Sequence, residues 1–352
     1  MISPANSVWP SVVGTEAELE DLLTRPSARL IESARSWSGP LVILGAGGKM
    51  GPTLAVLARR ALEAAGRRLE VVAVSRFTDP VARRWLDERG VRTQSCDLLG
   101  ADAEELRGLP DTEQVAYLVG LKFGTSKNPA ATWAMNTLVP ARVCERYPGA
   151  RVVALSTGNV YPMTEVVRGG ALETDPLTPL GEYANAAVAR ERVFEFCAKQ
   201  RGVKVALMRL FYAVDLRYGV PVDIAVKVWG GVPIRLENGA FQCIWQGDAN
   251  EAVLRAFDLV QEEPTAWNLC RPEVASVRET AQAMGRLLGR EPLLEGTETS
   301  TALLGNPGRL LGRLGMPAVT LERMMGWIAE WVRQGGRNLG RPTHFEVRDG
   351  RY

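Results

Sequence analysis

The amino-acid sequence predicts an α/β protein: a doubly wound parallel sheet with a smaller α/β lobe built from C-terminal pieces. Three observations support this fold class. Short apolar runs alternate with helix-like segments between residues 40 and 210, as in a parallel sheet with right-handed crossovers and helices on both faces. The chain has 352 residues, 46% of them hydrophobic, enough for about two domains. After Arg209, Gly and Pro interrupt the apolar segments, which indicates a less regular second lobe.

The expected domains follow these changes of pattern. We expect residues 1–39 to be an N-terminal extension and residues 40–210 to form the sheet domain, with 241–272 returning to it. Residues 211–240 and 273–352 would then form the lobe and a C-terminal tail. Ligands of such sheets bind at the carboxyl ends of the strands, so we expect the lobe to close over that edge.

Each element is predicted from its local pattern. Thr15 and Glu18 form a capping box, which predicts a helix that ends before Pro26. Apolar runs of strand length predict strands over 41–44, 69–74, 115–119, 151–155, 203–210 and 266–269. The segments between and after them predict helices over 52–65, 79–89, 129–147, 181–201, 248–260, 276–289 and 320–333. The last residues read as an irregular basic tail around the single histidine, His344.

The most specific pattern is the glycine-rich segment that follows the first predicted strand. Gly45, Gly48 and Gly51 are spaced three residues apart, Gly47 adds further freedom, and a helical run begins at once. Strand, glycine turn and helix in this order are typical of dinucleotide binding. The glycines allow the backbone to approach a pyrophosphate, and the helix N-terminus offers it free N–H groups and a partial positive charge. The alternative interpretation is a purely structural turn.

Composition excludes several other classes of function. The net charge is +2 and the charges are mixed along the chain, so nucleic-acid binding is not indicated. The five cysteines form no C-x-x-C pair and there is one histidine, which argues against a zinc site and a disulfide framework. No apolar run approaches the roughly 18 residues of a membrane span, and the N-terminus does not resemble a signal peptide. We therefore expect a cytoplasmic protein without a metal.

Further motifs line up over residues 40–290, and with them the chain resembles the extended short-chain dehydrogenase/reductases, the NAD(P)-dependent epimerases and dehydratases with a Rossmann fold. Those motifs are the glycine turn, Cys96-Asp97-Leu98, Asn136, Ser156-Thr157-Gly158-Asn159-Val160-Tyr161, Pro179-Leu-Gly-Glu-Tyr183, Arg209-Leu-Phe-Tyr, Gln246-Gly-Asp-Ala-Asn-Glu-Ala and Trp267-Asn268-Leu269. The resemblance implies that Tyr183 is the acid/base and that Thr157 donates a hydrogen bond to the reacting oxygen. It also implies a homodimer paired through the helices 129–147 and 181–201.

The resemblance further implies a set of cofactor-binding residues. These are Gly45, Gly47, Gly48, Lys49, Met50, Gly51, Ser75, Arg76, Asp97, Leu98 and Gly120. The implied function is that of an NADP(H)-dependent oxidoreductase, epimerase or dehydratase. It would act on a hydroxyl or carbonyl of a sugar-like small molecule by hydride transfer to or from the nicotinamide. The alternative is a catalytically impaired dinucleotide-binding protein with a regulatory or scaffold role.

One residue departs from the family pattern. The family carries a lysine four residues after the tyrosine, where its charge lowers the pKa of the phenol, but this chain has Ala187. Another cation could replace it, and Lys122, directly after the strand 115–119, is the stronger candidate. Arg190 is the weaker one, because it lies two turns, about 10 Å, further along the helix and cannot release its proton. Tyr183 could also work without a cation, or the protein could bind a dinucleotide without turnover.

The cofactor type is predicted from the end of the second strand. An acidic residue there selects NAD(H), because it accepts hydrogen bonds from the ribose 2′-hydroxyl and repels a 2′-phosphate. This strand ends in Ser75 and Arg76 instead, and an arginine pairs well with phosphate. Lys49 adds a second positive charge in the glycine turn. These residues favour NADP(H) over NAD(H).

Overall fold

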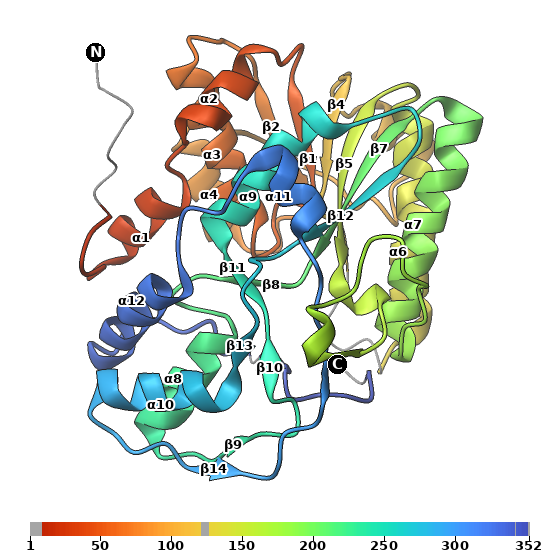
Figure 1. Ribbon diagram of the computed structural model, residues 1–352. Coiled ribbons are helices and arrows are strands. Elements are labelled where there is room, and N and C mark those ends of the chain that lie inside the picture. The colour runs from red at the N-terminus through yellow and green to blue at the C-terminus, as the bar shows by residue number, and fades with distance from the viewer. Residues whose placement is uncertain (1–8, 121–126, 342, 351–352) are drawn as a thin grey trace.

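The fold is built on one parallel sheet (Figure 1). The computed structural model describes residues 9–120, 127–341 and 343–350. Within these residues seven strands pair in the order β12-β7-β5-β4-β1-β2-β3, and every pair is parallel. Their bounds are β1 (Leu41–Leu44), β2 (Val71–Ser75), β3 (Arg92–Ser95), β4 (Gln114–Tyr117), β5 (Arg151–Thr157), β7 (Lys204–Leu210) and β12 (Thr265–Leu269). The predicted doubly wound α/β fold is confirmed.

The strand β3 is the one member of the sheet that the pattern did not predict. Its sequence is Arg-Thr-Gln-Ser, and its side chains are exposed or half-buried. It forms the edge of the sheet beyond β2, where little apolar surface is covered. An edge strand of this kind carries no apolar run, so periodicity cannot reveal it.

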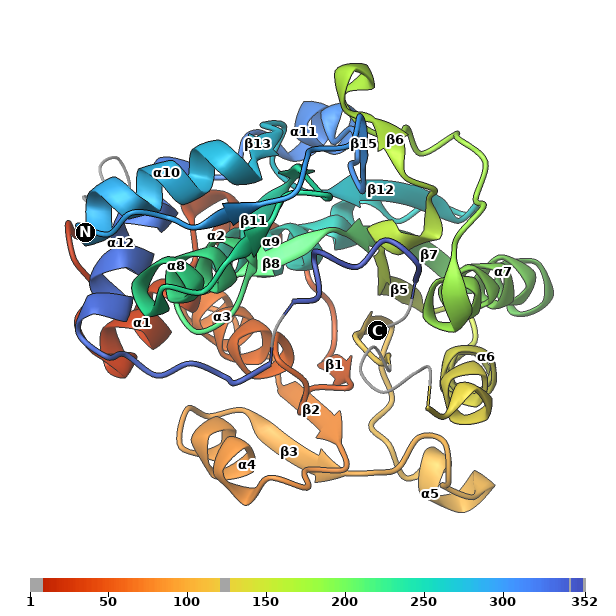
Figure 2. The ribbon, with the colours of Figure 1, turned by 90° about the horizontal axis from the view of Figure 1, so that it is seen from below.

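Helices cover both faces of the sheet (Figure 2). On one face, Ile43 and Ala116 pack against α2, α3 and α9, and on the other, Val42 and Val115 pack against α6 and α7. This alternation explains why the central strands are apolar throughout, since both of their faces are buried. The helix bounds are α2 (Ala28–Arg35), α3 (Gly51–Ala64), α4 (Pro80–Asp87), α5 (Ala103–Arg107), α6 (Pro129–Arg146), α7 (Gly181–Arg201), α9 (Gln246–Arg255) and α11 (Gly308–Leu314).

The second lobe has its own core and lies at the carboxyl edge of the sheet. Trp245 and Trp327 meet edge to face at its centre, 5.4 Å between ring centroids. The N-terminal extension contributes to this core through Leu19 and Leu23 of α1 (Glu16–Leu23). The other helices of the lobe are α8 (Val220–Gly230), α10 (Val277–Leu288) and α12 (Leu321–Arg333). Its short strands are β8 (Tyr212–Val214), β9 (Ile234–Arg235), β10 (Ala240–Phe241), β11 (Cys243–Trp245), β13 (Ala275–Ser276) and β14 (Leu294–Glu295).

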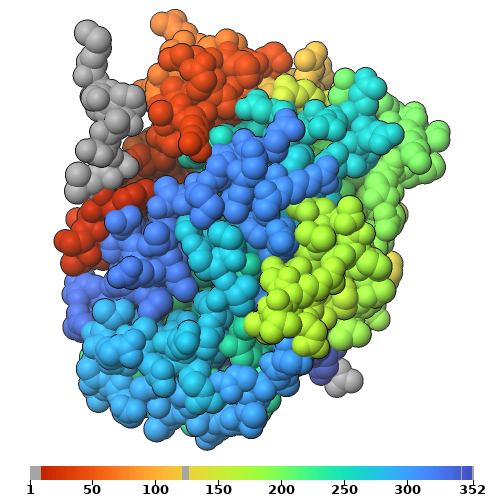
Figure 3. Space-filling view, viewed as in Figure 1, coloured from red at the N-terminus to blue at the C-terminus, as the bar shows by residue number. Residues whose placement is uncertain are grey.

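Short pairings connect the sheet domain to the lobe. Strand β6 (Thr164–Glu165) pairs antiparallel with β15 (Thr301–Ala302), and Ala171 forms a bridge with Gly305. In the space-filling view, the yellow-green segment near residue 170 accordingly lies against the blue residues of the lobe (Figure 3). The remaining elements are the 3-10 turns η1 (Gly158–Val160), η2 (Val166–Arg168) and η3 (Ala256–Leu259). No helix among the described residues has the length and apolar character needed to cross a membrane.

The C-terminal tail is docked onto the molecule. The backbone N–H and the hydroxyl of Thr343 both donate to Asp223 in α8, at 2.8 and 2.6 Å. Arg348 donates to the carbonyl and hydroxyl oxygens of Thr301, at 2.8 and 2.6 Å. Gly350 then touches the backbone at Gly181, since a Cβ on Gly181 would lie 2.8 Å from the Gly350 carbonyl carbon. The tail therefore runs from the lobe to the first turn of α7.

Candidate active site

The glycine turn lies where the topology of the sheet reverses. Strand β1 has β2 on one side and β4 on the other, and the helices that follow β1 and β4 cover opposite faces. Such a switch point opens a crevice at the carboxyl ends of the strands, which is where ligands bind in this class of sheet. The glycine turn therefore lies at the switch point, and its role in cofactor binding stays a prediction.

Two of the glycines are required by close backbone contacts. Gly45 has φ +83°, and a Cβ there would lie 2.9 Å from both the carbonyl carbon of Leu118 and the amide nitrogen of Val119. A Cβ on Gly51 would lie 2.4 Å from the carbonyl oxygen of Ala46. The helix α3 begins here, and its N-cap residue Met50 has no side-chain capping bond. Tight turn, close approach and open helix N-terminus fit the pyrophosphate of a dinucleotide.

Exchanging Gly45 tests this turn. We expect Gly45→Ala to lose about 1–2 kcal/mol of stability from the left-handed backbone and to weaken dinucleotide binding roughly tenfold or more, because the new methyl group displaces the backbone of Leu118 and Val119. Gly66→Ala is the matched control: Gly66 has φ +69° with nothing within 4 Å of its Cβ position. Urea unfolding and calorimetric titration with NADH and NADPH measure both effects. Equal binding losses in the two variants would contradict the assignment.

Lys49 turns toward the lobe. Its Nζ donates to the carbonyl oxygen of Ala213 at 2.8 Å and lies 4.0 Å from the ring centroid of Tyr218. Burial raises the pKa of Tyr218, and the neighbouring Asp223 and Tyr183 act in the same direction. The ammonium group of Lys49 is thus held between Ala213 and the ring of Tyr218. The predicted contact of Lys49 with a 2′-phosphate gains no support from this placement.

The other predicted cofactor residues line the carboxyl ends of β2, β3 and β4. Ser75 packs against the turn, since a Cβ on Gly47 would lie 2.6 Å from its Oγ. Arg76 follows as an exposed residue. Asp97 caps the turn after β3 by accepting from the Leu99 amide at 3.2 Å, while Leu98 is buried in the sheet core. These positions allow contact with the adenosine half of a dinucleotide.

Thr157 and Tyr183 come from two elements in contact. Thr157 ends β5, is 7% exposed, and donates to Asn159 Oδ1 at 3.0 Å. Tyr183 lies in the first turn of α7 and is 8% exposed. The 3-10 turn η1, directly after Thr157, packs against α7. A pocket of about 470 Å³ opens beside this turn of α7, lined by Pro129, Trp133, Gly181, Glu182, Asn185, Asp349 and Gly350.

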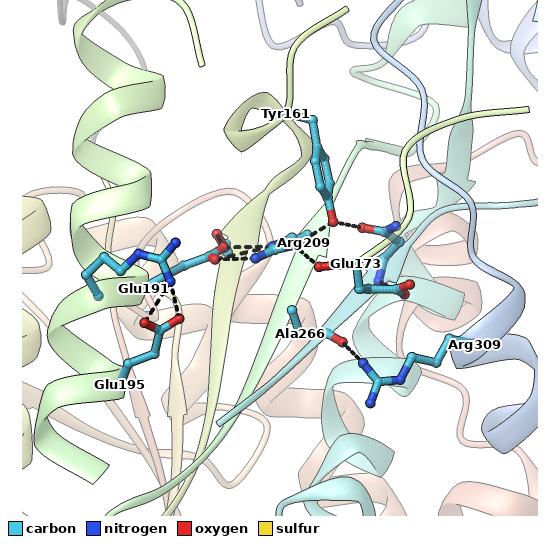
Figure 4. Close-up of polar contacts among 10 residues, drawn as sticks. Tyr161, Glu173, Glu191, Glu195, Arg209, Ala266 and Arg309 are labelled. Carbon is cyan, nitrogen blue, oxygen red and sulfur yellow. Dashed lines mark hydrogen bonds and ion pairs between the residues drawn. The ribbon is translucent and has the colours of Figure 1, made fainter. Parts of the chain in front are cut away.

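A buried ion pair joins α7 to the strands of the sheet (Figure 4). Glu191 in α7 is fully buried and accepts from Arg209 in β7, at 2.7 Å from NH2 and 3.1 Å from Nε. Ser156, the neighbour of Thr157 in β5, donates to the same carboxylate. The carboxylate thus ties the helix that carries Tyr183 to the strand end that carries Thr157.

The network continues toward the lobe. Arg209 NH1 donates to the hydroxyl of Tyr161 at 2.6 Å, and that hydroxyl donates to Asn268 Oδ1 at 2.9 Å. Burial raises the pKa of Tyr161 to about 12, although Arg209 opposes the shift. Asn268 in turn donates to the carbonyl oxygen of Ala171 at 2.8 Å. The sequence motifs contain Arg209, Tyr161 and Asn268, but only the structure reveals that they form one network with Glu191.

Arg190 occupies a buried position next to β4. It is 4% exposed, and its NH1 donates to the carbonyl oxygen of Val119 and to Asn136 Oδ1, both at 3.1 Å. The carboxylate of the adjacent Glu191 is taken by Arg209. From the sequence, Arg190 is a weaker candidate than Lys122, because it lies further along the helix and cannot release its proton, and this order stays a prediction. Lys122 itself lies outside the described residues.

Comparisons with known proteins show which family and which structures this chain resembles. A family model described as NAD dependent epimerase/dehydratase family matches residues 41–214. A search of curated proteins gave no match. Among solved structures, UDP-glucuronic acid 4-epimerase from Bacillus cereus in complex with NAD has a TM-score of 0.69 at 17% identity, covering 84% of this chain and 96% of the other.

Two further structures are similar. MoeE5 in complex with UDP-glucuronic acid and NAD has a TM-score of 0.67 at 22% identity, over 84% of this chain and 100% of the other. UDP-glucose 4-epimerase from Thermus thermophilus in complex with NAD has a TM-score of 0.64 at 21% identity, over 84% and 99%. The chain is thus similar to the NAD-dependent epimerase/dehydratase family over residues 41–214, and it shares its fold with these solved structures.

Proposed function

We propose that the protein transfers hydride between a bound nicotinamide dinucleotide and a hydroxyl or carbonyl carbon of a sugar nucleotide, as an epimerase, dehydratase or oxidoreductase. The observation that carries this proposal is that Thr157 and Tyr183 come from two contacting elements, and that β5, which ends in Thr157, lies in the same parallel sheet as the strand before the glycine turn. MoeE5 is in complex with UDP-glucuronic acid and NAD, and the Thermus thermophilus UDP-glucose 4-epimerase is in complex with NAD, and this supports the substrate class. The cofactor, when bound, supplies the hydride acceptor and donor.

In this proposal the protein's own residues move one proton. The phenol of Tyr183 takes the proton of the substrate hydroxyl during oxidation and returns it during reduction. Thr157 donates a hydrogen bond to the same oxygen and holds it in place. Lys122 remains the cation predicted from sequence to support Tyr183. The docked tail lies against the first turn of α7 at Gly181, beside the phenol.

The test identifies the bound dinucleotide and the reaction product in the same preparation. The purified protein is denatured, and the released dinucleotide is identified by chromatography. Wild-type protein is then incubated with UDP-glucose or UDP-glucuronic acid, and the anomeric protons are followed by NMR. New anomeric signals without added cofactor support an epimerase that retains its dinucleotide, whereas stoichiometric NAD(P)H formation supports an oxidoreductase. A bound dinucleotide with neither result, for these and related nucleotide sugars, favours the second candidate below.

The second candidate is a dinucleotide-binding regulatory or scaffold protein. It is favoured by Ala187, which is fully buried where the family carries its lysine. A methyl group cannot supply the charge that favours an ionised phenol. Conformational change on dinucleotide binding, without turnover, would support this role.

The choice between NADP(H) and NAD(H) is tested at Arg76. The similar structures contain NAD, while the exposed Arg76 at the end of β2 favours the 2′-phosphate of NADP(H). We expect Arg76→Asp to weaken NADPH binding about tenfold or more and to leave NADH binding unchanged or improved. Calorimetric titrations with both cofactors measure this. Equal losses of affinity for NADPH and NADH would show that Arg76 does not select between the two cofactors.

We also propose that the protein is a homodimer paired through α6 and α7. Leu138 in α6 is 53% exposed and Phe196 in α7 is 63% exposed, and exposed apolar side chains on adjacent helices indicate a contact surface. We expect the double variant Leu138→Glu and Phe196→Glu to sediment as a monomer, because paired carboxylates would lose hydration in the contact. Val167→Glu, at a residue 95% exposed elsewhere, is the control. A monomeric wild type would refute this proposal.

A further inference from the structure

The guanidinium group of Arg190 is buried without a carboxylate partner among the described residues. Its hydrogen-bond partners in the described part of the chain are the neutral oxygens of Val119 and Asn136, and its Nε has no partner there. The sequence 121–126, Leu-Lys-Phe-Gly-Thr-Ser, contains no acidic residue. Removing a charge from water is costly unless an opposite charge or a full set of hydrogen bonds compensates it. An arginine in this position therefore calls for an explanation beyond packing.

Helix geometry explains how Arg190 reaches this place. Residues 183, 187 and 190 share one face of α7, because neighbours on a helix surface are three and four residues apart. Side chains on a helix lean toward its N-terminus, so the long side chain of Arg190 extends back over residue 187. Ala187 is fully buried, and its methyl group carries no charge. Arg190 is the next cation along this face of the helix.

The charge ends beside the crevice at the switch point. Arg190 NH1 contacts the carbonyl oxygen of Val119, and it would lie 3.1 Å from a Cβ on Gly120. The backbone of Leu118 and Val119 touches the glycine turn at Gly45. The charge of Arg190 also acts inside the sheet: burial raises the pKa of Tyr117 in β4, and Arg190 opposes this shift. In a dinucleotide held by the glycine turn, the nicotinamide half lies on the β4 side.

We propose that Arg190 supplies, from the next turn of α7, the buried positive charge that Ala187 cannot supply, and that this charge acts on the nicotinamide half of the cofactor. It is a positioning residue: it holds the end of β4 and sets the electrostatic potential there. The inference rests on the proposed function, because it requires that a nicotinamide dinucleotide binds in the crevice.

The test separates charge from packing by comparing oxidised and reduced cofactor. The oxidised nicotinamide ring is positively charged and the reduced ring is neutral, so a nearby cation disfavours the oxidised form. Arg190→Gln keeps donors for Val119 and Asn136. We expect it to lower the dissociation constant of the oxidised cofactor, relative to that of the reduced cofactor, by roughly tenfold. Arg190→Lys should retain the wild-type ratio. Fluorescence and calorimetric titrations of both forms give the four constants.

Matched variants make the outcome decisive. Arg192→Gln, at an exposed arginine of the same helix that pairs with Glu195, should leave the ratio unchanged. If Arg190→Gln does not fold, Ala187→Lys with Arg190→Ala should keep the wild-type ratio, and Ala187→Gln with Arg190→Ala should shift it. An unchanged ratio in Arg190→Gln, or in the double variant with Ala187→Gln, would overturn the inference. It would also be overturned if the shift occurred in Lys122→Gln or Lys49→Gln and not in the Arg190 variants. Failure of the wild type to bind either cofactor would refute the proposed function first.

Discussion

Tyr183→Phe should lower turnover by roughly 10²–10⁴-fold, the range that general acid/base catalysis contributes, while dinucleotide binding and stability stay close to wild type. The phenylalanine ring fills the same space in the first turn of α7, where Tyr183 is 8% exposed. Only the hydroxyl that we propose exchanges a proton with the substrate is lost. Initial rates on the nucleotide sugar identified above measure the effect, together with NADH titration and urea unfolding.

Tyr147→Phe is the control for Tyr183→Phe. Tyr147 is 2% exposed at the end of α6, and its hydroxyl is buried without a hydrogen-bond partner. This substitution should leave turnover unchanged, because the lost hydroxyl makes no bond. If Tyr183→Phe turned over at the wild-type rate, Tyr183 would not be the acid/base, and another group would have to move the proton.

Removing either partner of the Glu191–Arg209 pair should destabilise the protein by about 3–5 kcal/mol, because the remaining charge stays buried without compensation. Glu191→Gln leaves the guanidinium of Arg209, which is itself 4% exposed, without an opposite charge. Arg209→Met leaves the carboxylate of Glu191 without an opposite charge, between Ser156 and β7. Urea unfolding gives the free energies of unfolding.

Two further variants distinguish this buried pair from a surface pair. Arg192→Met breaks an exposed pair, with Arg192 and Glu195 side chains 58% and 36% accessible, and should change the stability by no more than about 1 kcal/mol. Glu191→Leu combined with Arg209→Met removes both charges and should recover part of the loss. A double variant as unstable as the sum of the single variants would show that the pair is not coupled.

The same variants should report on the site. Glu191 holds α7 against Ser156 and Arg209, and Tyr183 lies about two turns up the same helix. A small shift of α7 therefore moves the phenol away from Thr157. The turnover of Glu191→Gln should therefore be below that of the wild type even when it is calculated per folded molecule.

Much of the sheet domain was predictable because its strands are buried on both faces. The apolar run at β1 coincides with the observed strand, and the helices α6 and α7 match their predicted spans to within one residue. The edge strand β3, the short helices α5 and α11, and the helix α8 in the lobe were not predicted. Their sequences are short, polar or interrupted by Pro and Gly, so they depend on neighbours that a local pattern does not include.

The sequence by itself determined the glycine turn, from local spacing, and the fold class, from the alternation of apolar runs and helical segments. Its resemblance to a family proposed the pair Thr157 and Tyr183, which stays a prediction. Only the tertiary structure decided which charges are buried and what they face. It paired Glu191 with Arg209, turned Lys49 toward Tyr218, and brought Arg190 to the end of β4. Such contacts join residues far apart in the chain or depend on the reach of a long side chain, and neither is encoded in local sequence spacing.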